Sequence, residues 1–428
     1  MFEMLFLFLF EKNIEIMKLD RRIFFKAFSL LVALSIILGL SFGCNRARQA
    51  DEKPYLVVLS LDGFRWDYPQ YFSTPNLDKM AQEGVHAHSL IPCFPTKTFP
   101  NHYSIATGLY PDHHGIIQNS FYVPAIGTYE PTNRQSIMNG AFYEGEPIWL
   151  TAENQGMKSA CCYWVGSEAP IKGKYPSIWL RYNQDLPFTS RIDSVIAWLQ
   201  LPSEKRPHLI MWYMHQPDKI GHHEGPLAAS TGRMVSYLDS LVGVFRARLN
   251  ELPIAKKVNF VVVSDHGMAK VNESNNLYVD QLVPRYWITM ACGGEVQMNL
   301  DGIPAYKDSL YQRLKKVNHL TVWKKEEVPQ RLHYSTNPRI YDLVVLADTG
   351  WNIMLTHPAK ILPGHHGYDN VYPDMHGIFY GVGPAFKNGY ERPSFENIHL
   401  YPLFAHILKL KPAVVDGRLK EVEDILKD

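Results

Sequence analysis

An excess of charge of either sign is absent from this sequence. Its 428 residues include 43 lysines and arginines against 42 aspartates and glutamates, which gives a formal net charge of +1. No basic stripe stands out, so we expect no binding to a nucleic-acid duplex through bulk electrostatics. Internal repeats and low-complexity tracts are also absent, and the composition is that of an ordinary globular protein. The length suits one large α/β domain or two smaller ones.

Cysteine is scarce, with five in the whole chain. Four of them lie beyond the N-terminal region: Cys93, Cys161, Cys162 and Cys292. They are too few and too irregularly spaced for a disulfide framework or for a zinc site built from cysteines. One disulfide among them is compatible with an exported protein, and the sequence leaves its connectivity open.

The N-terminal region carries a long hydrophobic run, residues 27–43, which follows several basic residues and ends at Cys44. Basic residues, a hydrophobic stretch and small residues near a cleavage point are typical of an export signal. The small residue before Cys44 is similar to that of a bacterial lipoprotein signal, whose cysteine is acylated after cleavage. We therefore expect residues 1–44 to be the signal and residues 45–53 a polar linker, with Met17 an alternative to the first methionine as the true start.

A cleaved secretion signal and a retained membrane anchor are the two alternatives, because the hydrophobic run is just short of a comfortable membrane span. All three interpretations place the remainder of the chain outside the cytoplasm, in the periplasm or at the cell surface. The lipoprotein interpretation attaches it to a membrane through acylated Cys44.

Three continuous hydrophobic runs predict buried strands, and each leads to an aspartate. The runs are residues 55–61, 208–214 and 258–264. Continuous rather than alternating hydrophobicity indicates strands that are covered on both faces, as in a parallel sheet. Ligands of such sheets bind outside the carboxyl ends of the strands. We therefore expect Asp62, Asp218 and Asp265 to converge although they lie far apart in sequence.

Helical and strand-like patterns fill the rest of a main domain that we expect to span residues 54–428. Helix signals lie at residues 74–84, 147–154, 188–201, 227–250 and 398–410. A short strand is expected at residues 159–164, and residues 120–145 are expected to be loop. Residues 269–360 alternate short strand-like and helix-like pieces, beginning with a strand-like piece at residues 295–299. This pattern predicts a smaller α+β insertion.

The stretch from Phe94 to Tyr103 is dense in unusual residues, with two prolines, two threonines, a lysine and a second aromatic. A short helix is expected to begin at Tyr103, which places Thr98 just before a helix N-terminus. Free backbone N–H groups and the helix dipole favour a bound anion at such a position, so the Thr98 hydroxyl is a candidate nucleophile toward phosphate. A purely structural hydroxyl in a capped loop is the alternative, and Thr96 is a second candidate.

Histidines accompany the strand-end aspartates. His222 follows Asp218 by four residues, His266 is next to Asp265, and His366 lies near the end of the chain. Aspartate and histidine supply the oxygen and nitrogen ligands that suit zinc. Three carboxylates gathered without cations would repel one another, which favours bound metal. Each piece alone is also compatible with an ordinary turn or surface loop.

Several motifs together resemble one known family. In chain order they are Asp62-Gly63-Phe64-Arg65, Pro95-Thr96-Lys97-Thr98-Phe99-Pro100-Asn101-His102-Tyr103, Thr107-Gly108-Leu109-Tyr110-Pro111, Pro217-Asp218 with Gly221-His222, Ser264-Asp265-His266-Gly267-Met268 and His366-Gly367-Tyr368-Asp369-Asn370. They closely resemble the nucleotide pyrophosphatase/phosphodiesterase family of the alkaline phosphatase superfamily, from about Pro54 to the C-terminus. The resemblance implies an α/β fold, an alkaline-phosphatase-like three-layer sandwich with a mostly parallel central sheet.

The resemblance also implies two zinc ions per chain. One would be bound by Asp218, His222 and His366. The other would be bound by Asp62, Thr98, Asp265 and His266. The neighbouring His223 and His365 are alternative ligands, and only the motif match favours His222 and His366 over them. Strand-end aspartates, accompanying histidines and this resemblance together predict a two-metal site.

The catalytic and substrate-binding residues come from the same resemblance. It implies that Thr98 rather than Thr96 is the nucleophile and forms a phosphothreonine intermediate. Asn119 would donate a hydrogen bond to a phosphate oxygen in the transition state. Phe99 and Tyr213 resemble the walls of a nucleobase slot, and Tyr182 is a possible third wall.

We therefore expect a zinc-dependent phosphodiesterase/nucleotide pyrophosphatase that releases nucleoside monophosphate. The alternatives are a phosphodiesterase acting on choline or glycerol head groups, whose cation an aromatic slot also suits, and a phosphomonoesterase of the same superfamily. A sulfatase is excluded because Lys97 stands where its Cys-x-Pro-x-Arg motif needs arginine. A non-catalytic, metal-structured surface binding protein would be expected to lose Thr98 or a metal ligand. The physiological substrate and the oligomeric state are left open.

Overall fold

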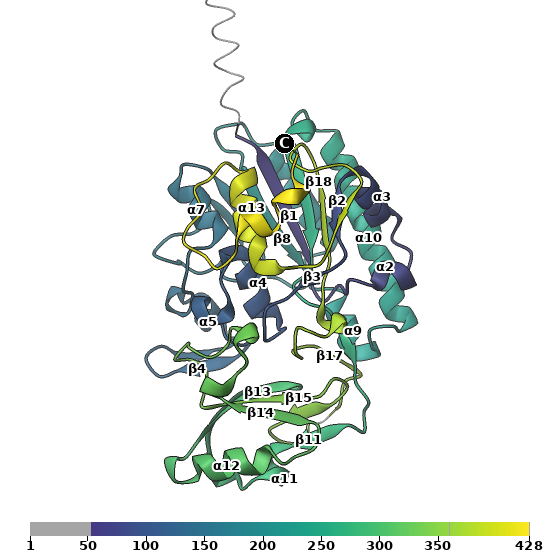
Figure 1. Cartoon of the computed structure of the whole chain (residues 1–428). Helices are drawn as coiled ribbons and strands as arrows, with labels where there is room; N and C mark the ends of the chain where they lie inside the picture. Colours follow the sequence, from purple (N-terminus) through teal and green to yellow (C-terminus); the bar gives the residue numbers. More distant parts are fainter. Residues whose placement is uncertain (1–52, 359, 428) are drawn as a thin grey trace, which may run out of the picture. The chain divides into compact units, whose positions relative to one another are not determined.

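The computed structural model describes residues 53–358 and 360–427 (Figure 1). The expected export signal and nearly all of the expected linker lie outside the described residues. Within the described part, no helix combines the length and hydrophobicity that a membrane crossing requires. The four cysteines of this part are buried and free of disulfides.

An eight-stranded sheet with the order β19-β2-β18-β9-β1-β8-β6-β7 forms the centre of the structure. Its strands are β1 (Tyr55–Leu61), β2 (Val85–Ala87), β6 (Ser159–Cys162), β7 (Ile178–Leu180), β8 (Leu209–Met214), β9 (Val258–Val263), β18 (Phe379–Val382) and β19 (Tyr390–Arg392). Strands β9, β1, β8, β6 and β7 run parallel to one another, and β18 is antiparallel to both of its neighbours. The expectation of a mostly parallel sheet is confirmed.

Helices cover both faces of this sheet. One face carries α3 (Pro75–Glu83), α8 (Phe188–Leu199) and α10 (Ala229–Asn250), and the other carries α4 (Thr98–Thr107), α7 (Ile148–Asn154) and α13 (Leu400–Ile407). Figure 1 labels α3 and α10 on one side of the sheet and α4, α7 and α13 on the other. Leu56 and Val58 of β1 pack into one hydrophobic cluster, whereas Val57 and Leu59 pack into the other. Burial on both faces explains why the strand sequence is continuously hydrophobic, and it confirms the three-layer sandwich.

The region expected to be loop, residues 120–145, contains regular structure, so that expectation was wrong. Strands β4 (Phe121–Val123) and β5 (Gly127–Tyr129) form an antiparallel hairpin, and helix α6 spans Arg134–Ile137. The rings of Phe121 and Tyr129 stack with their centroids 5.0 Å apart. Strands of three residues are too short to show an alternating pattern, so aromatic packing determines this structure.

A second, four-stranded antiparallel sheet lies at one end of the described body in Figure 1, with the order β12-β13-β15-β14. Its strands are β12 (Ile288–Gly294), β13 (Gln297–Gly302), β14 (Leu320–Lys324) and β15 (Leu343–Ala347), and helix α12 (Lys307–Leu314) packs against it. The strand expected at residues 295–299 begins only at Gln297, because Glu295 and Val296 form the turn between β12 and β13. The outline of residues 269–360 as an insertion stays a prediction.

Smaller elements complete the fold. They are α2 (Tyr68–Tyr71), β3 (Leu90–Ile91), α5 (Pro111–His114), α9 (Asp218–Glu224), β10 (Ala269–Lys270), β11 (Asn276–Tyr278), α11 (Val279–Leu282), β16 (Asn352–Met354), β17 (Gly364–His365) and β20 (Phe395–Glu396). In sequence, β10 precedes β11 and the smaller sheet, and its antiparallel partner β17 follows that sheet and β16. Their pairing therefore brings the segment carrying His365 next to the strand that follows β9.

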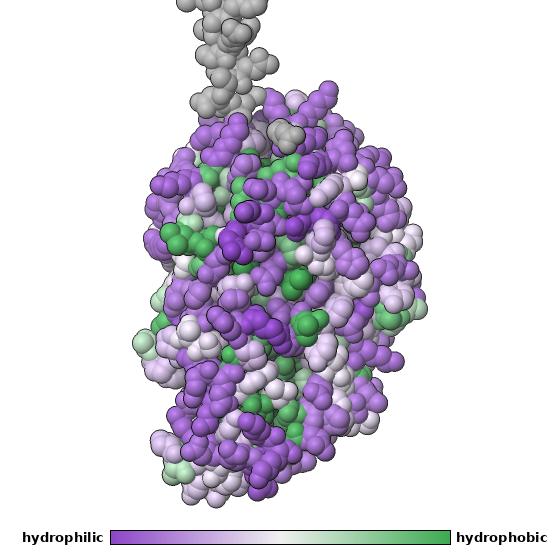
Figure 2. Space-filling model, in the orientation of Figure 1, coloured by the Kyte–Doolittle hydropathy of each residue, from purple (hydrophilic) through white to green (hydrophobic). Residues whose placement is uncertain are grey.

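Hydrophilic residues cover most of the face drawn in Figure 2, and hydrophobic residues form small separate groups. Exposed large hydrophobic side chains include Tyr71, Tyr286 and Val371, which belong to different parts of the fold. Single exposed hydrophobic side chains are ordinary on a protein surface. Buried polar residues gather instead at the carboxyl end of the central strands, among them Asp62, Asp265 and His266.

A buried carboxylate ties the segment between β14 and β15 to the main body. Asp112 in α5 accepts hydrogen bonds from the backbone N–H of Thr336 at 2.9 Å, from its hydroxyl at 2.7 Å and from the backbone N–H of Asn337 at 2.7 Å. Charge-assisted bonds of this kind are stronger than neutral ones, and the Asn337 N–H is buried together with the acceptor. This contact therefore holds the smaller sheet against the sandwich.

We predict that Asp112→Ala lowers the free energy of unfolding by about 2–4 kcal/mol, because two N–H groups and one hydroxyl lose their acceptor. Urea denaturation of the purified chain measures this. The matched control is Asp308→Ala, whose exposed carboxylate pairs with Lys324 and should contribute less than about 1 kcal/mol. Equal losses in the two variants would contradict the anchoring role.

Candidate active site

The three strand-end aspartates converge as expected. Strands β9, β1 and β8 are parallel neighbours, so their carboxyl ends meet at one edge of the sheet. Asp62 follows β1 directly, Asp265 follows β9 after one serine, and Asp218 is the first residue of α9. Backbone hydrogen bonds fix two of them together, because the Asp218 N–H donates to the Asp62 carbonyl at 2.9 Å.

Gly63 is the residue that permits this close approach. Its φ is +66°, and a Cβ atom there would lie 2.9 Å from the Asp218 Cα. A side chain would therefore clash with the backbone of the second aspartate, in a conformation that favours glycine. The Gly63 N–H also donates to Asp265 Oδ1 at 3.2 Å. The Asp-Gly motif is thus required for the site as well as for the turn.

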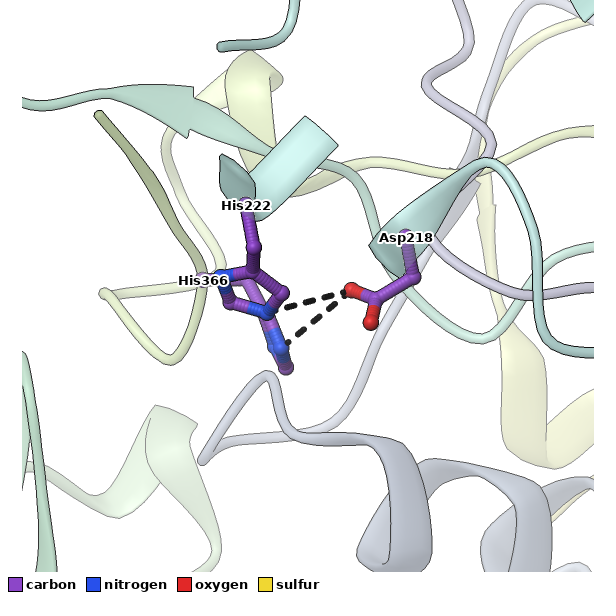
Figure 3. A group of neighbouring side chains, drawn as sticks. All are labelled: Asp218, His222 and His366. Carbon is purple, nitrogen blue, oxygen red and sulfur yellow. Dashed lines mark ion pairs between the residues drawn. The ribbon is translucent and has the colours of Figure 1, made fainter. Parts of the chain in front are cut away.

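The side chains form two groups, in each of which the potential ligand atoms lie within 4.8 Å of one another. One group is Asp62, Asp265 and His266, and the other is Asp218, His222 and His366. In the second, Asp218 Oδ1 lies 3.3 Å from His222 Nε2 and 3.6 Å from His366 Nε2, and Figure 3 shows both rings directed at this carboxylate. The His266 and His366 rings stack at 3.6 Å, so the two groups are adjacent.

Each of the three histidines is oriented by a backbone carbonyl. The Nδ1 atoms of His222, His266 and His366 lie 2.7, 2.8 and 2.8 Å from the carbonyl oxygens of Gly364, Gly267 and Thr96. A proton on Nδ1 donates to that oxygen and leaves the Nε2 lone pair free to bind a cation. Histidines that ligate metals are oriented in this way.

The carboxylates also fit bound cations. Asp62 Oδ1, Asp218 Oδ1 and Asp265 Oδ2 are buried and accept no hydrogen bond. Burial raises the pKa of the Asp62 carboxyl well above its usual range, and the Asp265 and Asp218 carboxylates raise it further. Burial also raises the pKa of the Asp265 carboxyl, but the nearby His266 and His102 outweigh burial and lower this pKa. Divalent cations would satisfy these buried oxygens and remove the repulsion.

Helix α4 begins at Thr98 rather than at Tyr103, so the helix is longer than expected at its start. The two prolines before Tyr103 suggested loop, but Pro100 lies in the first helical turn, where its missing N–H costs nothing. Thr98 is therefore the first residue of the helix, with Lys97 at the N-cap position. Its Oγ1 lies 3.1 Å from His266 Nε2.

The two threonines of this segment have different surroundings. The Thr96 hydroxyl is fully buried, donates to the Tyr368 carbonyl at 3.0 Å and accepts from the Gly367 N–H at 2.9 Å. It is therefore occupied in holding the loop that carries His366. The Thr98 hydroxyl instead lines two cavities. The geometry favours Thr98 as the reactive hydroxyl, in agreement with the motif resemblance.

Asn119 lies beside the start of α4. Its Oδ1 accepts a hydrogen bond from the Phe99 N–H at 2.9 Å. This contact fixes the amide orientation and leaves the Nδ2 group as a donor in the cavity that Asn119 lines. The residue is thus placed to hydrogen-bond an oxygen near Thr98.

Two connected cavities open at Thr98. One, rich in aromatic side chains and about 290 Å³ in volume, has Phe99, Tyr182, Tyr213 and Trp164 in its lining. The other, of about 360 Å³, shares these residues except Trp164 and extends past Asn119 to Asp218, His222 and Glu295. The Tyr213 hydroxyl donates to Asp62 Oδ2, so it links the aromatic cavity to the carboxylates.

The rival histidines lie outside both groups. His223 is exposed on α9. His365 is buried, but its Nδ1 is 3.8 Å from Glu295 Oε2. Neither contributes to the candidate metal-binding groups found among the described residues.

Residues 56–369 match the family model of type I phosphodiesterase/nucleotide pyrophosphatase. The chain belongs to this family. Ectonucleotide pyrophosphatase/phosphodiesterase family member 5 from Homo sapiens is 34% identical over 399 residues, which are 92% of this chain and 83% of that protein. Member 1 from Homo sapiens is 35% identical over 88% of this chain, and venom phosphodiesterase 2 from Crotalus adamanteus is 33% identical over 91%.

The chain spans less than half the length of some relatives that it matches, namely 42% of human member 1 and 49% of the venom enzyme. Among solved structures, murine family member 5 covers 88% of this chain with a TM-score of 0.84 and 32% identity, and the chain covers all of it. That structure is of an inactive threonine-to-alanine variant in complex with AMP. The likeness confirms the predicted alkaline-phosphatase-like fold.

Two residues near the site were missed by the sequence analysis of this phosphodiesterase-family chain. His102 is buried, with Nε2 2.8 Å from the Ser60 hydroxyl and Nδ1 2.9 Å from the Thr98 carbonyl and 3.3 Å from Asp265 Oδ2. It supports Asp265 from behind, and its place within the threonine-containing motif could have indicated it. Glu295 comes from the smaller sheet, and no motif in the sequence signals it.

Glu295 forms an ion pair with Lys97, whose Nζ lies 2.9 Å from Glu295 Oε2. Enclosure in the cavity wall raises the pKa of the Glu295 carboxyl, but Lys97, His365 and His222 outweigh it and lower the pKa to about 2. The carboxyl is therefore ionised at every ordinary working pH.

We predict that Thr96→Val lowers the free energy of unfolding by about 1–3 kcal/mol, because the Gly367 N–H and the Tyr368 carbonyl lose their partner. The matched variant Thr98→Val should lose less than about 1 kcal/mol, because its hydroxyl faces a cavity. Urea denaturation of both variants in chelator measures the difference. A larger loss in Thr98→Val would contradict the division of roles.

Proposed function

We propose that this protein is a metal-dependent phosphodiesterase/nucleotide pyrophosphatase that hydrolyses nucleotide phosphodiesters or phosphoanhydrides to nucleoside monophosphate. One observation carries the proposal: the Thr98 hydroxyl lies at the N-terminus of α4, next to two carboxylate–histidine groups and at the mouth of an aromatic cavity. The names of the relatives and the AMP complex of murine member 5 support it.

Two zinc ions are proposed as cofactors. Asp218, His222 and His366 would hold one, and Asp62, Thr98, Asp265 and His266 would hold the other. The buried carboxylate oxygens without donors and the carbonyl-oriented histidines support these assignments. When bound, the ions would supply Lewis-acid stabilisation of negative charge on the attacking and leaving oxygens.

The chain's own residues perform the displacement. The Thr98 hydroxyl loses its proton to solvent as Oγ1 attacks phosphorus, the bond to the leaving group breaks, and the leaving oxygen departs with the electron pair. Asn119 donates from Nδ2 to a non-bridging phosphate oxygen and stabilises the charge that develops there. Water then attacks the phosphothreonine, breaks its P–O bond to Thr98 and releases the nucleoside monophosphate.

The aromatic cavity is proposed to hold the nucleoside. Phe99, Tyr182 and Tyr213 line it and offer ring faces on which a nucleobase can stack. The same rings would also attract the cation of a choline head group, which makes a head-group phosphodiesterase the second candidate function. A non-catalytic role is disfavoured because Thr98 and both candidate ligand groups are present.

Export is part of the proposal, although its signals lie outside the described residues. The hydrophobic run before Cys44 supports a periplasmic or cell-surface location with acylation of that cysteine. Residues 54–428 would form the catalytic domain, and residues 269–360 its inserted region.

We predict that Thr98→Ala lowers turnover by at least about 1,000-fold, because it removes the nucleophile. Its zinc content, measured by atomic absorption, should stay near that of the wild type. Asp218→Ala should lose its turnover and the one zinc ion that Asp218 is proposed to hold, whereas Thr189→Ala, at an exposed position of α8, should change neither turnover nor zinc content. A Thr98→Ala protein that keeps wild-type hydrolysis would refute the assignment.

We also predict that residues 45–428, assayed with zinc, hydrolyse a nitrophenyl nucleotide diester faster than nitrophenyl phosphocholine or a nitrophenyl monophosphate. Stacking in the aromatic cavity is expected to favour the nucleotide by at least about tenfold in kcat/KM. Preference for phosphocholine would assign the cavity to lipid head groups. Best turnover of the monoester would identify a phosphatase instead.

A further inference from the structure

The turn between β12 and β13 reaches the active site from the smaller sheet. Glu295 and Val296 form this turn, and the Glu295 carboxylate meets Lys97, the residue before the nucleophile, at 2.9 Å. Two backbone bonds hold the turn in place: Ile353 N–H donates to the Glu295 carbonyl and Ala347 N–H to the Val296 carbonyl, each at 2.8 Å. The position of the carboxylate is therefore fixed by the second sheet.

The backbone of Glu295 adopts a left-handed conformation, with φ of +65°. Residues other than glycine rarely adopt this conformation. The two preceding residues, Gly293 and Gly294, also have positive φ. Strained conformations of this kind are retained where the surrounding structure enforces them, often at functional sites. The turn thus places a glutamate where a glycine would be easier to accommodate.

The ion pair presents its negative end to the cavity. The Lys97 side chain is only 5% exposed, whereas that of Glu295 is 45% exposed. Glu295 lines the cavity of about 360 Å³ and Lys97 does not. A ligand in this cavity therefore meets the carboxylate first and the ammonium group behind it.

The part of this cavity beyond the aromatic slot is where the second substituent of a substrate must lie. If the nucleoside occupies the slot between Phe99 and Tyr213, the group on the other side of phosphorus faces Asp218, His222 and Glu295. That group leaves in the proposed reaction. The exposed Lys219 also lines this part, so its opposing positive charge is solvated.

We infer that Glu295 is a specificity-determining residue that disfavours strongly anionic leaving groups. The site would then prefer phosphodiesters whose second substituent is uncharged or cationic over nucleoside polyphosphates, whose leaving group is pyrophosphate. This inference rests on the proposed function, because it names the substrate class of the same site. One carboxylate facing a multiply charged leaving group across a partly hydrated cavity changes relative kcat/KM by about tenfold.

The test compares two substrates that share one nucleoside: nitrophenyl thymidine 5′-monophosphate and thymidine triphosphate. Both are assayed with the zinc-loaded chain and without magnesium, which would neutralise the triphosphate. In Glu295→Gln, the ratio of kcat/KM for the triphosphate to kcat/KM for the diester should rise about tenfold. The matched control Glu273→Gln, at an exposed position, should leave the ratio unchanged.

Two further readouts separate charge selection from a structural effect. The ratio of kcat/KM for the triphosphate to kcat/KM for the diester should differ less between wild type and Glu295→Gln in 1 M salt. Salt screens the repulsion between the Glu295 carboxylate and the triphosphate in an open cavity. In a Thr98→Ala background, calorimetry should show tighter binding of the triphosphate once Glu295 is replaced. Equal losses for both substrates would mean that Glu295 only braces Lys97, and this would overturn the inference.

The outcomes for the wild type are also distinct. A wild-type chain that hydrolyses both compounds, with a ratio that Glu295→Gln does not move, overturns this inference alone. A wild-type chain that hydrolyses neither compound overturns the proposed function and this inference with it.

Discussion

The mutual repulsion of three carboxylates, two of them buried and the third half-buried, is the constraint on which the rest of this structure depends. Parallel pairing of β9, β1 and β8 forces Asp62, Asp218 and Asp265 to one edge of the sheet, where each has one buried oxygen that accepts no hydrogen bond. Such an arrangement is tolerable only with positive charge nearby. The three histidines, which backbone carbonyls orient with Nε2 free to bind a cation, suit metal ions as the source of that charge. The fold and the chemistry are therefore determined by the same strands.

Those strands were also the part that the sequence predicted best. Runs that are buried on both faces show plainly as continuous hydrophobic residues, and a parallel sheet dictates where the following residues go, so the convergence of Asp62 and Asp265 could be predicted. The start of α4 at Thr98 could not, because proline is equally compatible with a loop and with a first helical turn. The hairpin of β4 and β5 was missed because aromatic packing, not periodicity, defines it.

Glu295 illustrates a different limit. Its place in the site depends on a turn in the second sheet, on the anchoring of that sheet through Asp112, and on the contact with Lys97. Each of these is a long-range contact between segments without a shared local pattern. Sequence motifs identify site residues that lie at the end of a strand or at the start of a helix. A side chain that a second sheet places in the site is identified only from the structure.

The contact between His366 and Thr96 has a consequence for how the protein matures. It joins residues 270 positions apart, and it orients a histidine of one candidate metal group from the segment that holds the nucleophile. The two candidate metal-binding groups cannot both be complete early in synthesis, because His366 is synthesised long after Asp62. The entropy lost in closing so large a loop grows only slowly with its length. The site therefore forms late because His366 is synthesised late, and not because closing the loop is especially unfavourable. Assembly of the reactive centre thus requires that the chain has been synthesised through the whole of the smaller sheet and as far as His366.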